Sequence, residues 1–241
     1  MKTARWFEDG VYSYKGVDGQ LTGLYVELLH DAMRRMDCTV QWRELPWARA
    51  LLAMEAGQLD ILPGARKTAD RERFAYFSRP VNRSPNVLYI SLAANERYTL
   101  RKLADIVGTD FRLGVQIGVA YGPEYDELIK KAEFARHTRS FAVRRNAWNL
   151  LPMGRLDGLI ADEMTASSEL KALGLNNLVV RTKVVISDEP GQYALSKRTT
   201  SPEFVAALDK ALNAMLTDGS YKRIRERFVP CITSVETQGC R

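Results

Sequence analysis

The sequence predicts an α/β protein in two parts, each a mainly parallel sheet flanked by helices. Short apolar runs of strand type alternate with longer amphipathic stretches of helical type along most of the 241 residues. This alternation is typical of parallel sheets, because two parallel strands need a long crossover that is usually a helix. The pattern runs through the chain twice, on either side of a short helix expected at Arg101–Ile106, and no internal repeat interrupts it.

The first series begins close to the N-terminus. It contains strands near 3–7, 39–43 and 59–62 and helices over 23–36 and 47–56. Trp47 opens the second of these helices, whose apolar residues have helical spacing, and Gly57 ends it. A further helix is expected behind Thr68, a residue type that favours the N-cap, with Asp70 in its first turn.

The second series has the same character and leads into two closing helices. It contains strands over 112–116, 135–138, 157–160 and 177–181 and helices over 123–133, 143–152 and 162–173. The closing helices are expected at Ser201–Leu216 and Tyr221–Phe228, with Gly219 between them. Ser201 followed by Pro202 is a strong start signal for the first of the two.

Composition places the chain among ordinary globular proteins and argues against several function classes. The net charge is +6, but the basic residues are dispersed, and the densest runs, 139–145 and 222–227, fit solvated helix faces. Nucleic-acid binding, which needs clustered Lys and Arg, is therefore not expected. The two histidines, His30 and His137, lie far apart, and no catalytic triad or metal-ligand cluster is visible, so we expect no metal and no cofactor.

The three cysteines divide into a pair and a single residue. Cys231 and Cys240 are nine residues apart after the last predicted helix, and we expect a disulfide between them that closes a small tail loop. Such a bond implies an oxidising compartment. Cys38, between a helix and a strand, is interpreted as a buried free thiol.

Five segments along the chain carry a family resemblance. They are Tyr12–Asp31, Leu59–Pro80, Phe111–Glu124, Leu156–Ser168 and Leu212–Phe228. In this order they resemble the bacterial extracellular solute-binding proteins of family 3, the polar-amino-acid receptors of ABC importers. The resemblance implies a type II periplasmic binding fold, in which two lobes joined by two hinge strands close on a small polar ligand.

The resemblance also implies how the chain is divided and where it works. It places residues 1–88 and 193–228 in lobe 1, residues 89–192 in lobe 2, and residues 229–241 in a C-terminal tail. The hinge strands are expected near Val87–Leu92 and Gly191–Ser196. The implied setting is the periplasm, with a signal peptide already removed ahead of Met1, as a monomer that delivers an amino acid or related carboxylate to ABC permease subunits.

Three residues are the leading candidates for ligand contact. Arg71 lies three residues past the Thr68 cap, just beyond a strand, and strand carboxyl ends are where open α/β sheets bind small ligands. The family's arginine at this position holds a carboxylate, in competition with a surface salt bridge to Asp70 or Glu72. Trp47 is expected to stack on the ligand rather than serve only as core. Asp162 is expected to bind an α-amino group, a role compatible with capping the following helix.

The remaining candidates include several departures from the family pattern. Gly64 would let the backbone approach a ligand, and Arg66 stands where the family commonly has Ser or Thr. For Arg66 two roles are open: binding an extra acidic group of the ligand, or an internal pair with Asp9 or Asp162. In lobe 2 the expected contacts are Gln116, Ala120 and Tyr121, although Ala120 lacks the hydroxyl that many relatives carry.

Lobe 1 departs from the family pattern at two further candidates. Trp6 replaces a common acidic residue, and Asp9 falls where an aromatic residue is usual. The ligands best known for the family therefore do not carry over directly, and a classical α-amino acid is the first choice.

Two other functions compete with the receptor interpretation. The same fold serves as the ligand-sensing domain of membrane signalling proteins, such as histidine kinases and cyclic-dinucleotide enzymes. A third class resembles cyclohexadienyl dehydratase, for which Glu163 is the one acid that the sequence nominates. Because Glu163 is expected to face solvent, the sequence favours binding over catalysis.

Overall fold

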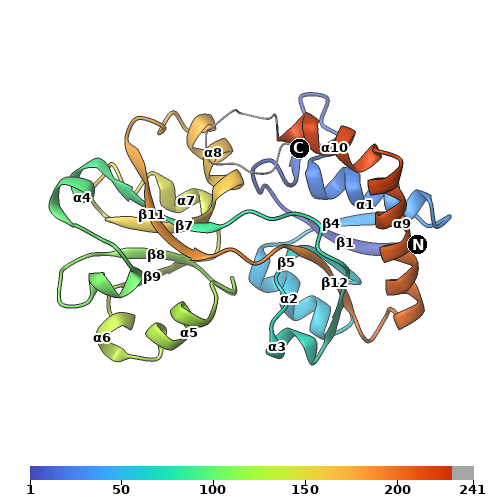
Figure 1. Cartoon of the computed structure of the whole chain (residues 1–241), viewed down its shortest axis with the longest axis horizontal. Helices are drawn as coiled ribbons and strands as arrows, with labels where there is room; N and C mark the ends of the chain where they lie inside the picture. The colour runs from blue at the N-terminus through green and yellow to red at the C-terminus, as the bar shows by residue number, and fades with distance from the viewer. Residues whose placement is uncertain (230–241) are drawn as a thin grey trace.

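The computed structural model describes residues 1–229 and shows two lobes side by side, each built on a five-stranded sheet (Figure 1). The first sheet has the order β4 (Val40–Glu44), β1 (Lys2–Trp6), β5 (Ile61–Ala65), β12 (Gln192–Ser196), β6 (Ala75–Phe77). The second has the order β11 (Val179–Ser187), β7 (Asn86–Ser91), β10 (Gly158–Asp162), β8 (Leu113–Gln116), β9 (Thr138–Phe141). In each sheet one strand, β12 or β7, runs antiparallel to both neighbours, so the predicted mainly parallel α/β architecture is confirmed.

Helices cover both faces of the first sheet. The helices α1 (Leu24–Arg34), α9 (Pro202–Thr217) and α10 (Ser220–Phe228) pack on one face and α2 (Trp47–Glu55) on the other. Strand β5 shows why both faces are apolar: Ile61 enters the core under α1 and α9, and Leu62 enters the core under α2. A strand that is buried on both faces reads as a continuous apolar run. A short hairpin, β2 (Tyr14–Lys15) with β3 (Leu21–Thr22), precedes α1.

The second lobe repeats this layering with shorter helices. Its helices are α4 (Leu92–Arg97), α5 (Pro123–Ile129), α6 (Ala132–Ala135), α7 (Arg145–Trp148) and α8 (Glu163–Ala172), with a 3₁₀ helix at Leu103–Ile106. Four sequence predictions need correction here, one of them the strand expected near 135–138, which is β9 and lies three residues later. The helix expected over 123–133 is split, because Lys131 adopts an extended backbone. The helix expected over 143–152 is confined to α7, and the strand expected over 177–181 continues to Ser187.

Two connections cross between the lobes. The chain passes from the first sheet to the second between β6 and β7, and returns between β11 and β12. These connections touch midway, where Asn82 and Gly191 form an antiparallel bridge and the Gly191 N–H donates to the Asn82 carbonyl at 2.8 Å. Figure 1 shows the two connections running together between the lobes. Strand β7 already belongs to the second sheet at Asn86, and the division at 88/89 and 192/193 stays a prediction.

Cys38 is a partly buried free thiol packed against the α1 core. Cys231 and Cys240 lie outside the described residues. Among residues 1–229, no helix has the length and apolar character needed to cross a lipid bilayer.

Candidate ligand-binding site

The carboxyl ends of strands from both sheets meet at a cavity of about 100 Å³ between the lobes. Strands β1 and β5 contribute the residues that follow them from one side, and β8, β9 and β10 contribute residues from the other. This is the edge at which open α/β sheets bind ligands. Most of the sequence-predicted site residues line this cavity: Asp9, Trp47, Gly64, Arg66, Arg71, Gln116, Ala120 and Asp162.

Two of the sequence-predicted site residues, Trp6 and Tyr121, do not line the cavity. The Trp6 ring is buried, and the Lys15 ammonium lies 5.4 Å from the centroid of this ring. Tyr121 lies inside the second lobe's core, and its hydroxyl accepts a hydrogen bond from the Gln116 N–H at 2.8 Å. Tyr121 therefore holds the loop after β8 from the core side. Its aromatic ring packs among apolar side chains, while its hydroxyl keeps a polar partner.

Arg71 points into the cavity from the first turn after Thr68. The Thr68 hydroxyl caps α3 (Ala69–Glu72) by accepting from the Arg71 N–H, as the sequence predicts. The guanidinium is 7% exposed and donates to the Arg66 carbonyl at 2.7 Å and the Gly118 carbonyl at 2.8 Å. Burial and the nearby charge of Arg66 lower the pKa of Arg71 to about 10. Within residues 1–229 no carboxylate oxygen lies within 4.0 Å of it, so the surface salt bridge considered for Arg71 is not formed.

Trp47 joins the first lobe to the loop after β8. Its indole N–H donates to the Gly118 carbonyl at 2.9 Å, so this carbonyl receives hydrogen bonds from both Trp47 and Arg71. The ring lies 5.6 Å from the Arg71 guanidinium carbon and 5.4 Å from that of Arg5, within the range of cation–π attraction. Gly118 has a φ of +79°, and a Cβ there would lie 3.3 Å from the Trp47 ring, so this close contact between lobes favours glycine.

Gly64 also has a left-handed backbone. Its φ is +75°, and a Cβ would lie 2.9 Å from the Tyr25 ring. Glycine is therefore required by the backbone conformation and by Tyr25, while Gly64 itself remains on the cavity wall.

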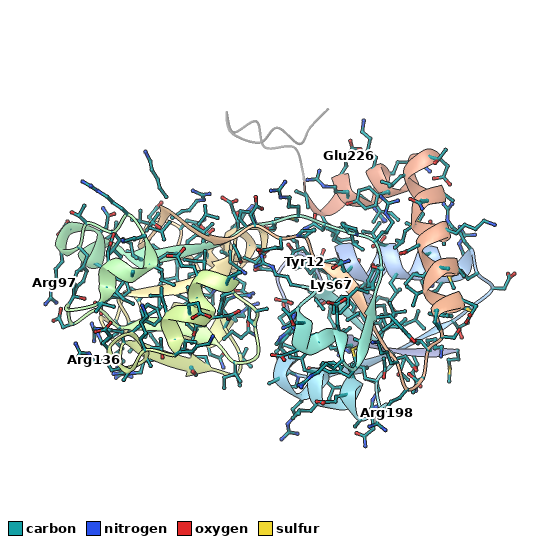
Figure 2. All side chains as sticks on the ribbon, turned by 60° about the horizontal axis from the view of Figure 1, so that its bottom comes forward. Tyr12, Lys67, Arg97, Arg136, Arg198 and Glu226 are labelled. Carbon is teal, nitrogen blue, oxygen red and sulfur yellow. The ribbon has the colours of Figure 1, made fainter. Side chains whose placement is uncertain are left out.

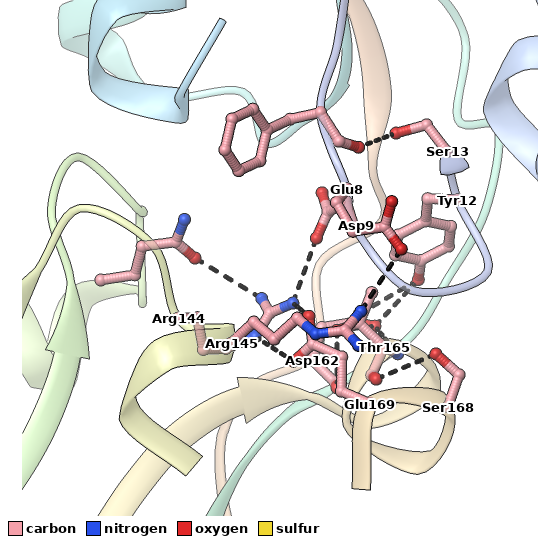
Figure 3. Close-up of polar contacts among 12 residues, drawn as sticks. Glu8, Asp9, Tyr12, Ser13, Arg144, Arg145, Asp162, Thr165, Ser168 and Glu169 are labelled. Atoms are coloured by element: carbon pink, nitrogen blue, oxygen red, sulfur yellow. Dashed lines mark hydrogen bonds and ion pairs between the residues drawn. The ribbon is translucent and has the colours of Figure 1, made fainter. Parts of the chain in front are cut away.

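Asp162 projects toward the same cavity from the second lobe (Figure 3). It caps α8 by accepting from the Thr165 N–H at 3.0 Å, and it accepts from the Tyr12 hydroxyl of the first lobe at 3.0 and 3.2 Å. Burial raises the pKa of Asp162, because removal from water disfavours the charged carboxylate. Among the described residues no Lys, Arg or His nitrogen lies within 4.0 Å of this carboxylate.

A buried arginine, Arg144, binds carboxylates from both lobes (Figure 3). Its guanidinium is held by Glu169 of α8 through bonds of 2.9 and 3.2 Å, and by Asp9 of the first lobe at 3.1 Å. Glu169 is 2% exposed and also accepts from the Trp148 indole at 2.5 Å. The two carboxylates raise the pKa of Arg144 in spite of its burial. The sequence interpretation of 139–145 as a solvated face is therefore wrong for Arg144.

Arg66 makes its contacts at the hinge end of the cavity. Its guanidinium donates to the Ser187 hydroxyl and to the Ser84 carbonyl at 3.3 Å, and a longer contact of 3.5 Å reaches the Ala120 carbonyl. Its nearest carboxylate in the described chain is Glu189, at 3.7 Å. The internal pair considered with Asp9 or Asp162 is not formed.

Sequence reasoning missed several residues of the cavity wall. They are Arg5, Tyr12, Ser13, Tyr25, Val26, Trp42, Pro63, Asn82, Ser84, Asn86, Val119, Arg144, Thr165, Glu189 and Gly191. A signal existed for Arg144, which follows the carboxyl end of β9 just as Asp9 follows β1. The hinge residues gave no comparable signal, because their place in the wall depends on the crossing of two segments that are far apart in sequence.

Charged groups outside this site are distributed over the surface. Figure 2 shows Arg97 and Arg136 at the outer end of the second lobe, and Arg198 and Glu226 on the first lobe, all away from Tyr12 in the cleft. Glu163, the acid considered for catalysis, pairs with Arg181 and does not line the cavity. Residues 1–229 contain no group of three or more His, Cys, Asp and Glu side chains able to hold a metal ion.

The two lobes, the double crossing and the polar cavity between them define the class of two-lobed solute-binding proteins. The chain belongs to the bacterial extracellular solute-binding proteins, family 3, whose model matches residues 10–230. The chain is 22% identical over 218 residues to the L-cystine-binding protein TcyJ of Escherichia coli (strain K12), covering 90% of this chain and 77% of that protein. It is 23% identical over 227 residues to the lysine/arginine/ornithine-binding periplasmic protein of the same strain, covering 90% and 82%.

Solved structures confirm the type II periplasmic binding fold. An ancestral arginine-binding protein bound to arginine superposes with a TM-score of 0.80 at 22% identity, covering 94% of this chain and 96% of that one. A histidine kinase sensor domain with similarity to periplasmic binding proteins gives a TM-score of 0.80 at 17% identity, covering 95% and 96%. AncCDT-1, an ancestral amino acid-binding protein and precursor of cyclohexadienyl dehydratase, gives 0.75 at 22% identity, with 94% of both chains covered. At these identities the likeness concerns the fold.

The buried position of Arg144 gives a first testable prediction. Replacing Arg144 with Met should lower the free energy of unfolding by about 3–5 kcal/mol, because Glu169 would remain buried without its cation. Urea denaturation followed by circular dichroism measures this change.

The neighbouring residue provides the control. Arg145 pairs with Glu8 at 3.3 Å on the surface, so Arg145→Met should change stability by less than about 1 kcal/mol. Equal effects of the two substitutions would contradict the importance assigned to the buried bridge.

Proposed function

We propose that the protein is an extracytoplasmic, periplasmic solute receptor that closes its two lobes on a small α-amino acid or related carboxylate and delivers it to an ABC importer. One observation carries this proposal. Arg71 of the first lobe and Asp162 of the second face the same cavity, and neither has an oppositely charged side chain within 4.0 Å among the described residues. An α-amino acid carries both complementary charges, so a single ligand would compensate both groups and join the lobes.

The rest of the wall would shape the ligand's surroundings. Trp47 supplies an aromatic surface beside Arg71, and the loop that carries Gln116 and Ala120 forms the wall of the second lobe. In this role the hinge connections allow the lobe built on the first sheet to move against the lobe built on the second. Family membership supports the receptor role, and the relatives that bind L-cystine or lysine, arginine and ornithine support an amino acid as ligand. The proposed receptor works as a monomer with permease subunits as partners.

The carboxylate role of Arg71 is tested with an amino-acid panel. A ligand at a hundred times its dissociation constant stabilises the native state by about 2.7 kcal/mol, which a thermal-shift screen detects. For the amino acid that binds, Arg71→Gln should weaken the affinity by about 10- to 100-fold, the value of a charged hydrogen bond. Isothermal titration calorimetry measures both proteins.

Arg73 is the matched control for this experiment. It lies two residues further along the chain and is 77% exposed, so Arg73→Gln should leave the affinity unchanged. A comparable loss in both variants would mean that the effect comes from the net charge and not from a bond to the ligand.

Asp162→Asn separates ligand binding from helix capping. Asn caps helices about as well as Asp, so the free energy of unfolding at pH 7 should not fall by more than about 1 kcal/mol. Because burial raises the pKa of Asp162, the folded state binds its proton more tightly than the unfolded state does, and stability falls as pH rises through the unfolded value near 3.9. The variant should lose this part of the pH dependence, which urea titrations from about pH 3 to pH 7 would reveal.

In contrast to stability, the affinity of Asp162→Asn for an α-amino acid should fall. Loss of the charged partner of the ammonium group should weaken binding by more than about tenfold. If stability instead falls in parallel with affinity, Asp162 acts through the helix and not through the ligand. Ser201→Ala, which removes the cap of α9 far from the cavity, calibrates the loss expected from a missing cap.

A sensory role is the second candidate function, favoured by the histidine kinase sensor domain that shares this fold. Both functions use the same cavity, so ligand binding does not distinguish them. Deletion of the gene does: a receptor is required for uptake of the radiolabelled ligand, whereas a sensor alters a transcriptional or second-messenger response while uptake continues.

A further inference from the structure

Arg66 and Arg71 reach different parts of the cavity wall. Arg71 donates to Gly118 and lies against Trp47, away from the hinge. Arg66 donates to Ser84, in the connection between β6 and β7, and to Ser187, the last residue of β11 before the return connection. The two guanidiniums therefore offer separate places at which an anion can be bound.

The hinge end of the cavity is polar and buried but has little negative charge of its own. Ser84, Asn86 and Ser187 are each less than 9% exposed, and the Asn86 amide donates to the Ser187 hydroxyl at 3.2 Å. The carboxylate nearest to Arg66 in the described chain belongs to Glu189, which is 55% exposed and 3.7 Å away. An ion pair with such an exposed partner is weak. The charge of Arg66, which is only 12% exposed, is thus poorly compensated.

Two other cations of the cavity wall are compensated by carboxylates of the protein. Arg144 is bound by Asp9 and Glu169, and Arg5 lies 3.5 Å from Asp9. In the proposed function Arg71 and Asp162 take the two charges that every α-amino acid carries. Arg66 is then the cavity cation left for the variable part of the ligand.

We propose that Arg66 is a specificity-determining residue that binds a second carboxylate, so that the protein selects amino acids with two carboxylates over those with neutral or basic side chains. This inference rests on the proposed function. The exposed carboxylate of Glu189, 3.7 Å from Arg66, would compete with such a ligand carboxylate for the guanidinium. A basic side chain would meet Arg66 instead, and like charges at a buried site are strongly unfavourable.

The test uses two pairs of ligands that have nearly the same shape and differ in one charge: glutamate with glutamine, and aspartate with asparagine. Calorimetry on the parent protein should show the acid of at least one pair binding about tenfold or more tightly than its amide. In Arg66→Gln this ratio should fall to about one, whereas Arg71→Gln should weaken acid and amide alike and leave the ratio in place. L-Cystine carries its second carboxylate beside a second ammonium group, whereas glutamate carries it on the side chain without a second ammonium group. A comparison of the affinities for L-cystine and glutamate shows which arrangement of the second carboxylate the site prefers.

The outcomes separate this inference from the function on which it rests. Tighter binding of the amide, or an acid-to-amide ratio that survives Arg66→Gln, overturns the role of Arg66 while the receptor function stands. Binding of no amino acid at all overturns both.

A second variant guards against misfolding of Arg66→Gln. Glu189→Gln removes an exposed charge, and it should raise the acid-to-amide ratio by about twofold or more because a competing anion is lost. A ratio that is unchanged or lower in this variant contradicts the proposal.

Discussion

The structure depends on one buried cation that two lobes share. Arg144 is removed from water, and an arginine remains charged under these conditions, so it needs carboxylates at close range. Glu169 comes from the same lobe as Arg144, but Asp9 comes from the other lobe. The bond to Asp9 is thus made only while the loop after β1 and the start of α7 lie together, whereas the bonds to Glu169 stay within one lobe. Two further hydrogen bonds cross the same interface between the lobes, from Trp47 to Gly118 and from Tyr12 to Asp162.

This arrangement divides the charges of the cleft into two sets. Arg144 and Arg5 face carboxylates of the protein, and together with Asp9 and Glu169 they form a fixed internal network. Arg71 and Asp162 are held in place by neutral hydrogen-bond partners. Neutral partners orient a charged group without cancelling its charge, so these two groups retain the ability to attract a ligand. The fixed network holds the wall in shape, and the uncompensated set provides recognition.

Local patterns predicted much of the fold and part of the site. Thr68 and Asp162 were recognisable as helix caps, and caps that follow a strand's carboxyl end place the neighbouring side chains at the ligand-binding edge. Non-local geometry was not recognisable. Arg144 lies in a basic run that resembles a surface helix, and one of its two carboxylate partners comes from a loop more than a hundred residues away. Tyr121 was misplaced for a related reason, because strand periodicity cannot tell which side of a loop faces a core.

The position of Arg66 connects ligand chemistry with lobe movement. A lobe rotation must be absorbed by the few residues of the crossing segments, and Arg66 donates to Ser84 within one segment and to Ser187 at the start of the other. An anion bound by Arg66 would draw on the same guanidinium that holds these two segments together. Recognition of a second carboxylate would then act directly at the hinge, whereas recognition by Arg71 acts at the loop around Gly118. A ligand able to reach both places would engage the closing contact and the hinge at once, and a ligand with one carboxylate would engage the closing contact alone.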